Sequence, residues 1–320
     1  MPLQPTDDFK RRVCKKLSHA SYRSNIDELV AEASEVGAIV RQTWPAIHGG
    51  RGFAAFTATV TLGNSGEAVI VAFRGTKGAT EWMTYPHAFS RAVLRTAEGL
   101  TAFTPFVDAL EEMWEEPGDW VNGYVADCSM EDSISRAFQG GRHVWLTGHS
   151  RGGAIAQLSS ALLLCGEESR QNPHLLRRLS VVTFNAPMAL VANDVLRYEE
   201  ARRLHGVEHR RIEHRGDMIR LLPAGLGLKH GGDQEMHGET LTESGNFART
   251  VGSALSAFAA GNGMQRSGSG LGSGSGEQRM NGGTVSTQDR DVGDGTNPQR
   301  LSLGSIAIAL VRHAAFAHST

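Results

Sequence analysis

The sequence of 320 residues has little of what marks exported, membrane-spanning or disulfide-stabilised proteins. Its first eight residues lack the basic start and apolar core of a secretory signal peptide. No apolar run approaches the roughly 18–20 residues of a transmembrane helix. The three cysteines, Cys14, Cys128 and Cys165, show neither metal-ligand spacing nor an obvious disulfide framework. These absences predict a reduced, cytoplasmic protein with no transmembrane segment.

The charge balance and the glycine pattern argue against nucleic-acid and nucleotide binding. The net charge of −2 implies no strong attraction to nucleic acid or to an anionic membrane. The phosphate-binding pattern G-x-x-x-x-G-K-[ST] is missing, and the glycine-rich residues 261–276 lack the flanking strand and helix that such a loop requires. A hydrophobic content of 40% and a charged content of 21% are those of an ordinary globular protein.

Composition divides the chain into four parts. Residues 1–48 are expected to form an N-terminal helical segment of the catalytic domain, and residues 49–260 its α/β core. Glycine, serine, asparagine and glutamine dominate residues 261–300, which predicts a disordered insertion. Residues 301–320 are again apolar and are expected to dock back onto the core as a helix.

Hydrophobic periodicity places helices and strands in alternation along the core. Helices are expected over about 8–43 and 103–114, and an inserted surface loop over 117–132. Strands are expected over 53–62, 68–73, 143–147, 181–184 and 207–214, with a hairpin turn at 63–66. This alternation predicts an α/β fold with a mostly parallel central sheet, an antiparallel N-terminal hairpin and flanking helices.

One pentapeptide, Gly148-His149-Ser150-Arg151-Gly152, carries most of the functional information. It fits G-x-S-x-G, the nucleophile elbow of α/β-hydrolases. A short apolar strand precedes it and an apolar stripe at helical spacing follows it, which is the context that the motif demands. We therefore expect Ser150 to be a catalytic nucleophile rather than part of a structural turn.

A serine nucleophile needs an acid and a base, which in α/β-hydrolases follow it in that order. Asp217 is the preferred acid because it directly follows an expected strand, although it could simply cap the next segment. Asp194 looks more like a helix N-cap, and Asp289 lies in the disordered stretch.

Four histidines follow Asp217 in the sequence: His230, His237, His313 and His318. We interpret His230 as structural, since it lies in a turn thirteen positions beyond the acid. The C-terminal pair, His313 and His318, are therefore the candidate bases.

Several sequence blocks, in one order over about residues 53–237, resemble the class 3, fungal-type lipase family. Val71 to Thr76 resembles the F-R-G-[ST] strand end, and Glu81-Trp82 the [DN]-W that opens the lid. Thr147 to Ala154 resembles T-G-H-S-L-G-G-A, with arginine in place of the usual leucine. Thr183 to Pro187 resembles T-F-[GN]-x-P, and Asp217 to Pro223 the segment that carries the family's acid. The histidine of the family's H-x-G-F block is absent before Gly99-Leu100.

The resemblance implies a role for each matching residue. Ser150 would be the nucleophile and Asp217 the orienting acid. The backbone N–H groups of Thr76 and Arg151 would form the oxyanion hole, with the hydroxyl of Thr76 as a further candidate donor. Trp82 would belong to a lid over about 81–93, although it could equally fill core. His313 fits the family's H-x-x-[YF] pattern and His318 the start of H-[ST]-x-Y-F, and His318 is narrowly preferred.

The sequence thus predicts a serine carboxylester hydrolase that cleaves acyl esters of lipids, such as triacylglycerol, through an acyl-enzyme. It would need no cofactor and no metal, and its partner would be a lipid or ester substrate, including one at a lipid–water interface. Two alternatives stay open: a phospholipase or galactolipase on the same scaffold, and a catalytically inactive homologue that binds lipid or a partner.

Overall fold

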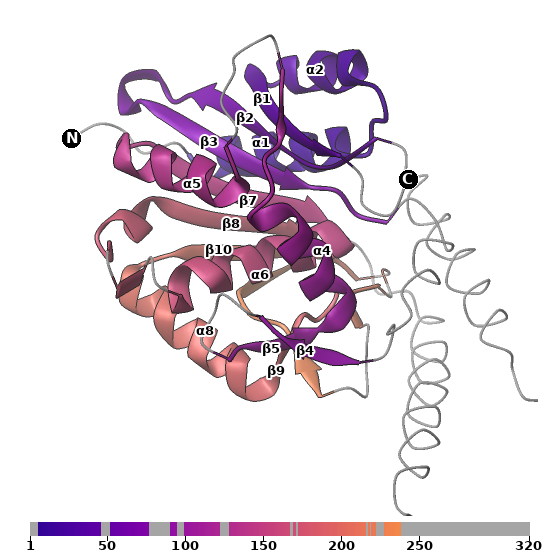
Figure 1. The fold of residues 1–320 in the computed structure, drawn as a ribbon, viewed down its shortest axis with the longest axis vertical. Coiled ribbons are helices and arrows are strands. Elements are labelled where there is room, and N and C mark those ends of the chain that lie inside the picture. The colour runs from indigo at the N-terminus through magenta and orange to yellow at the C-terminus, as the bar shows by residue number, and fades with distance from the viewer. Residues whose placement is uncertain are drawn as a thin grey trace, which may run out of the picture.

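An eight-stranded mixed sheet forms the centre of the computed structural model (Figure 1). The structure describes residues 6–45, 52–76, 90–94, 99–121, 128–166, 169–170, 172–215, 217, 219–221 and 227–237. The strands of the sheet are β1 (Ala38–Pro45), β2 (Phe53–Thr61), β3 (Glu67–Phe73), β6 (Asp119–Trp120), β7 (His143–His149), β8 (Leu179–Phe184), β10 (Glu208–His214) and β12 (Asp233–His237). Their order across the sheet is β12-β10-β8-β7-β3-β2-β1-β6.

The direction of the strands confirms the predicted architecture. Strands β3, β7, β8, β10 and β12 run parallel to one another, whereas β1, β2 and β3 form an antiparallel meander. Because the five parallel strands share one direction, their carboxyl ends meet at the same edge of the sheet. The loops that leave this edge are the ones that carry Thr76, Ser150 and Asp217.

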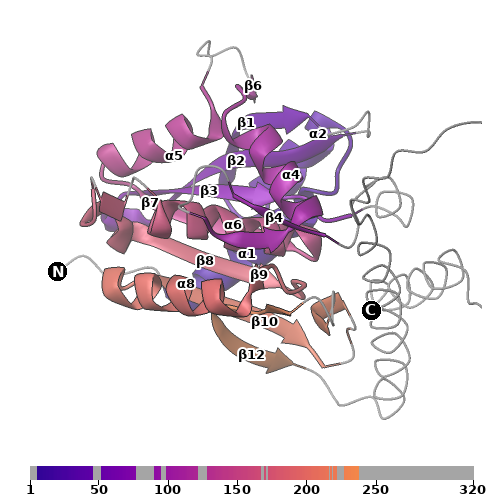
Figure 2. The ribbon, with the colours of Figure 1, turned by 60° about the horizontal axis from the view of Figure 1, so that its bottom comes forward.

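Helices cover both faces of the sheet, as Figure 2 shows. Helices α1 (Asp7–Ala20) and α2 (Ile26–Ser34) lie on one face, where fully buried Leu17 and Leu29 pack against strand residues such as Ile70. Helices α4 (Thr104–Trp114), α5 (Met130–Gln139), α6 (Arg151–Cys165) and α8 (Ala192–His205) belong to the core on the opposite face. Burial of these two apolar layers is the main stabilising contribution to the fold.

Smaller elements complete the part of the chain that the structure describes. A second, four-stranded sheet consists of β4 (Arg91–Val93), β5 (Thr101–Phe103), β9 (Leu190–Val191) and β11 (Leu228–Lys229). Three 3-10 turns, η2 (Gly63–Ser65), η3 (Leu175–Arg178) and η4 (Ile219–Leu221), connect larger elements. Cys14, Cys128 and Cys165, which all lie within the described residues, form no disulfide there. None of the helices within these residues is long and apolar enough to cross a membrane.

The prediction of helix over residues 8–43 is wrong for the last third of that range, which ends in a strand. The chain turns at Ser21 to Asn25, and Gly37, with a φ of +71°, ends the helical part. Residues Ala38–Pro45 are strand β1, which pairs with β2. The apolar positions at helical steps continue weakly into this segment, but its β-branched and aromatic residues pack better on a half-buried sheet face.

Two smaller expectations also need correction. Within the surface loop expected over 117–132, Asp119–Trp120 forms the edge strand β6, and α5 already begins at Met130. Asp194 is not the N-cap of α8, because that position is Val191. Its carboxylate instead accepts a hydrogen bond of 2.7 Å from the backbone N–H of Thr101, which ties α8 to the small sheet.

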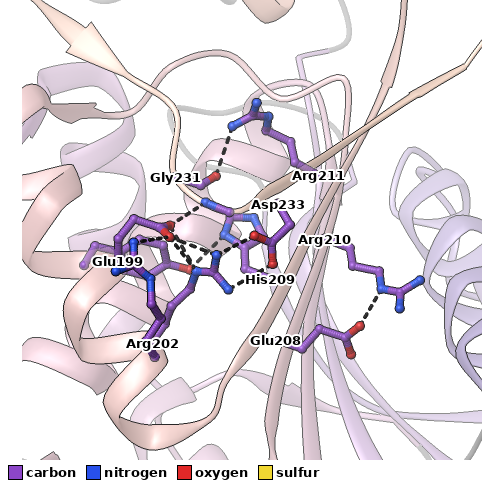
Figure 3. Close-up of polar contacts among 11 residues, drawn as sticks. Glu199, Arg202, Glu208, His209, Arg210, Arg211, Gly231 and Asp233 are labelled. Atoms are coloured by element: carbon purple, nitrogen blue, oxygen red, sulfur yellow. Dashed lines mark hydrogen bonds and ion pairs between the residues drawn. The ribbon is translucent and has the colours of Figure 1, made fainter.

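A partly buried polar network joins α8 to β10 and β12 (Figure 3). The ring of fully buried His209 lies 2.8 Å from the hydroxyl of Tyr198 on α8. Arg202 donates to both carboxylate oxygens of Asp233, at 3.1 and 2.7 Å, and also to Glu199. These contacts hold β12 beside β10. They thereby also hold the carboxyl end of β10, which Asp217 follows.

Candidate active site

Ser150 lies at the sharp turn between β7 and α6, as the motif predicts. Its backbone adopts φ +54° and ψ −129°, a strained combination for a residue with a side chain. The turn is held from both sides, because the N–H of Ser150 donates to the carbonyl of Phe184 at 2.9 Å and its own carbonyl accepts from Gly153 at 2.9 Å. Strain that persists within such a network is characteristic of functional sites.

The glycines of the motif are required by close backbone packing around this turn. A Cβ on Gly148 would lie 2.3 Å from the carbonyl carbon of Gly152, and a Cβ on Gly152 would lie 2.1 Å from the carbonyl oxygen of Phe73. Both distances are far below van der Waals contact. Only glycine therefore allows α6 to start directly against the ends of β3 and β7, with Ser150 between them.

The two residues predicted to form the oxyanion hole follow neighbouring strands at the carboxyl edge. Arg151 is the first residue of α6, so its N–H is one of the N-terminal amides that have no partner within the helix. Thr76 lies three residues after the end of β3, which pairs with β7. Its hydroxyl oxygen is buried and has no hydrogen-bond partner among the described residues. A buried, unpaired hydroxyl next to the elbow is a donor available to a ligand.

The adjacent residues Phe184 and Asn185 link Ser150 with Asp217, because Phe184 accepts the hydrogen bond from Ser150 and Asn185 bonds to the end of β10. Asn185, which follows β8 with a φ of +45°, donates its backbone N–H to Ile212 at 2.9 Å. Its side-chain oxygen accepts from the N–H of His214 at 2.6 Å, and the carbonyl of His214 accepts from Asp217 at 3.0 Å. Asn185 had no role in our sequence interpretation beyond its motif, although a conformation with positive φ is one that asparagine tolerates better than most residues.

Asp217 is buried at the carboxyl end of β10 and does cap the following turn. Its Oδ1 accepts a hydrogen bond of 2.8 Å from the N–H of Ile219, at the start of η4. This hydrogen bond is the capping contact that the sequence analysis gave as an alternative role for Asp217. A carboxylate can accept through both oxygens, so the cap holds the carboxylate in place and is compatible with orienting an imidazole.

A second buried carboxylate, Glu213, organises the turn after Asp217. Its side chain is 1% exposed and pairs with Nε of Arg211 at 2.5 Å. Arg220 and His230 approach the same carboxylate at 4.0 Å each, and His230 Nε2 lies 2.6 Å from the carbonyl of Arg220. Burial, with the positive charge of Arg211, lowers the pKa of His230 to about 4. His230 is thus neutral and packed against η4, which supports its interpretation as structural.

The residue before the nucleophile belongs to an aromatic group that the sequence did not reveal. Nδ1 of His149 lies 2.9 Å from the hydroxyl of Tyr22, which follows α1, and the ring of His19 stacks on that of His149 at 6.3 Å between centroids. Tyr22 and His19 each lie more than 120 positions from His149, so no local pattern could join them to it. The N-terminal helix therefore contributes directly to the wall of the site.

The remaining predicted site residues lie outside the described part of the chain. These are both candidate bases, His313 and His318, and Trp82 of the expected lid; of that lid segment only residues 90–93 are described. Within the residues that are described, no group of three or more histidine, cysteine or acidic side chains is arranged to hold a metal ion.

Comparisons with known proteins agree with this geometry. The family model for lipase (class 3) matches residues 70–226. The lipase of Rhizomucor miehei, solved as a propeptide complex, superposes with a TM-score of 0.53 at 18% identity, covering 72% of this chain and 67% of that one.

Two further solved structures have the same fold. A triacylglycerol lipase with a serine protease triad gives a TM-score of 0.55 at 18% identity, covering 74% and 82% of the two chains. The lipase of Rhizopus microsporus var. chinensis gives 0.52 at 16% identity, covering 73% and 74%. The comparison with curated protein sequences gives no match.

Proposed function

We propose that this chain, which the family model for lipase (class 3) matches over residues 70–226, is a carboxylic ester hydrolase that cleaves acyl esters of lipids such as triacylglycerol. The observation that carries the proposal is the strained conformation of Ser150 at the junction of β7 and α6. It holds the serine beside the first amides of α6, where an oxyanion can be bound.

The reaction proceeds through an acyl-enzyme. Ser150 Oγ attacks the ester carbonyl carbon while a histidine accepts its proton, and the oxyanion takes hydrogen bonds from the backbone N–H groups of Thr76 and Arg151. The tetrahedral intermediate collapses, and the histidine returns the proton to the leaving alcohol. Water then attacks the acyl-serine in the same way and releases the fatty acid.

Asp217 keeps the histidine in the tautomer that accepts the proton, and stabilises the imidazolium that forms. Its burial supports this role, because a carboxylate acts more strongly on a partner where water is excluded. His318, with His313 as the alternative, supplies the imidazole.

Reaction with a fluorophosphonate probe tests whether the serine is activated. The intact protein should be labelled at Ser150, as located by peptide mass spectrometry, and Ser150→Ala should not be labelled. An intact protein that fails to react would overturn the hydrolase proposal and favour a homologue that only binds lipid or a partner.

The substrate class is tested separately by the release of fatty acid. Triacylglycerol emulsions, phospholipid micelles and galactolipid micelles should be compared at equal acyl-chain length. We expect the highest rate on triacylglycerol. A higher rate on either polar lipid would assign the enzyme to the phospholipase or galactolipase alternative.

A further inference from the structure

A cavity of about 360 Å³ lies far from Ser150, at the other end of the parallel strands. Among its lining residues, Glu67 opens β3 and Arg142 immediately precedes β7, whereas Ser150 follows the carboxyl end of β7. A strand rises roughly 3.3 Å per residue, so the seven residues of β7 separate the two sites by about 20 Å. The cavity is therefore separate from the site around Ser150.

A bulge in β1 brings the first of three arginines to this cavity. The register of β1 against β2 passes from Val40–Ala58 to Gln42–Thr57, so Arg41 is the extra, unpaired residue. Bulges redirect a side chain and are frequent beside functional sites. Here Nε of Arg41 donates to the hydroxyl of Thr59 at 3.0 Å, and both residues line the cavity.

Helix α5 and the start of β7 supply the other two arginines. Ser133 and Arg136 line the cavity from α5, where residues three apart share one helix face. Arg142 lines it from the turn that follows the helix. Arginines from β1, from α5 and from the turn before β7 thus line the same cavity.

These arginines have no anionic partner in the part of the chain that the structure describes. Neither Arg41, Arg136 nor Arg142 forms an ion pair there, in contrast to every arginine of β10 and α8. Among the described lining residues, Glu67 is the only carboxylate, so the wall has a net positive charge. The single carboxylate of Glu67 offsets the mutual repulsion of three guanidinium groups only in part, and a bound anion would offset more of it.

We infer that this cavity binds a ligand with a phosphate group. Guanidinium groups present forked donors that match phosphate oxygens, and the hydroxyls of Thr59 and Ser133 add further donors on two sides. A phosphate monoester carries close to two negative charges at pH 7, which complements three arginines and one glutamate. The volume leaves room for the phosphate and a small organic group attached to it.

Binding of inorganic phosphate to the full-length protein, measured by isothermal titration calorimetry at constant ionic strength, tests the inference. We expect saturation at one site, and at least a tenfold weaker affinity in Arg136→Gln and in Arg142→Gln. Arg177→Gln is the matched control, because Arg177 is exposed on η3 and does not line the cavity, and it should bind as the intact protein does. No saturation, or equal weakening in the control, would overturn the inference.

Two sources of the phosphate group are distinguished by a second measurement. Glycerol phosphate in solution represents a soluble ligand, and vesicles of phosphatidylcholine with added phosphatidic acid represent a lipid headgroup. Competition of glycerol phosphate with inorganic phosphate supports a soluble ligand, and co-sedimentation that requires phosphatidic acid, Arg136 and Arg142 supports a headgroup. If neither occurs, the site does not recognise phosphate esters and the inference fails. Fluorophosphonate labelling of Ser150 should be unchanged in both variants, so these results do not depend on the hydrolase proposal.

Discussion

The hydroxyl of Tyr22 lies 2.9 Å from Nδ1 of His149, the residue that immediately precedes the nucleophile. Tyr22 follows α1, on the face of the sheet opposite α6, and its ring is tilted by 57° against the imidazole. The contact joins the N-terminal helix to the elbow. It also brings Tyr22 against Gly75 in the loop that carries Thr76, so three segments distant in sequence form one wall of the site.

Substitution of Gly75 by alanine should inactivate the enzyme. The added Cβ would lie 1.9 Å from the hydroxyl of Tyr22 and 2.6 Å from the carbonyl oxygen of His149, so the loop with Thr76 must move. A displacement of about 1 Å can cost on the order of 100-fold in rate, measured here as kcat on a soluble p-nitrophenyl ester. Gly140→Ala is the control, because its Cβ would approach no atom closer than 3.2 Å. Equal activity in the two variants would contradict the placement of the loop.

Elements that are encoded by local sequence patterns could be predicted from the sequence. The strand, elbow and helix around Ser150 follow from apolar periodicity and glycine spacing, and they occur at β7 and α6. The hairpin of β2 and β3 follows from alternation around a glycine-rich turn. In these cases the neighbours that decide the conformation are close in sequence.

The contacts that the sequence did not predict join distant segments. Periodicity predicts helix where the structure has strand β1, because its partner β2 lies beyond a glycine-rich break and pairing across that break outweighs helical periodicity. Tyr22 and Asn185 build the site through hydrogen bonds to residues 127 and 29 positions away. Such contacts depend on how the sheet is ordered, which periodicity does not specify.

Glu213→Gln should destabilise the protein and misplace Asp217. The substitution leaves the guanidinium of Arg211, whose side chain is only 9% exposed, without its counter-charge. Removing one partner of a buried ion pair typically costs about 3–5 kcal/mol, which urea denaturation would measure. Glu235→Gln is the control, since its ion pair with Arg11 is half-exposed and should contribute at most about 1 kcal/mol. Similar losses in the two variants would show that the Glu213 network does not hold the turn.

The stability of the protein should fall as the pH drops from about 6.5, with part of this loss due to His209. Burial, together with the charges of Arg211 and Arg202, lowers the pKa of His209 to about 3 in the folded protein. The unfolded chain, with a histidine pKa of about 6.5, therefore binds more protons between these two values. Stability is present above pH 6.5 and is lost toward pH 3, at up to about 1.4 kcal/mol per pH unit for this one group.

His209→Gln isolates that contribution. In urea titrations at pH 7.5, 6.0 and 5.0, the variant should be less stable at pH 7.5, because its contact with Tyr198 is altered, but should lose less stability on acidification. His205→Gln, on the partly exposed end of α8, should keep the pH dependence of the intact protein. If His209→Gln keeps the full slope, His209 is not held neutral by its burial.

The catalytic base should be identified by substituting each C-terminal histidine with asparagine. We expect His318→Asn to lose activity by a factor of at least about 10⁴, as removal of a triad histidine does elsewhere. His313→Asn should stay within about tenfold of the intact enzyme. The reverse result would assign the role to His313. Full activity in both variants would refute a base at the C-terminal end of the chain.

Thr76→Val gives the sharpest separation of a catalytic role from a structural one. Valine has nearly the shape of threonine and keeps the backbone N–H, so only the hydroxyl is lost. That hydroxyl is buried without a partner among the described residues, and burying an unpaired polar group costs roughly 1–3 kcal/mol. The variant should therefore be as stable as the intact protein or more so.

If the hydroxyl donates to the oxyanion, kcat should nevertheless fall by about 100-fold with little change in KM, and Thr76→Ser should restore most of it. A hydroxyl with a purely structural role would give the opposite pattern, with lower stability in urea and an unchanged kcat.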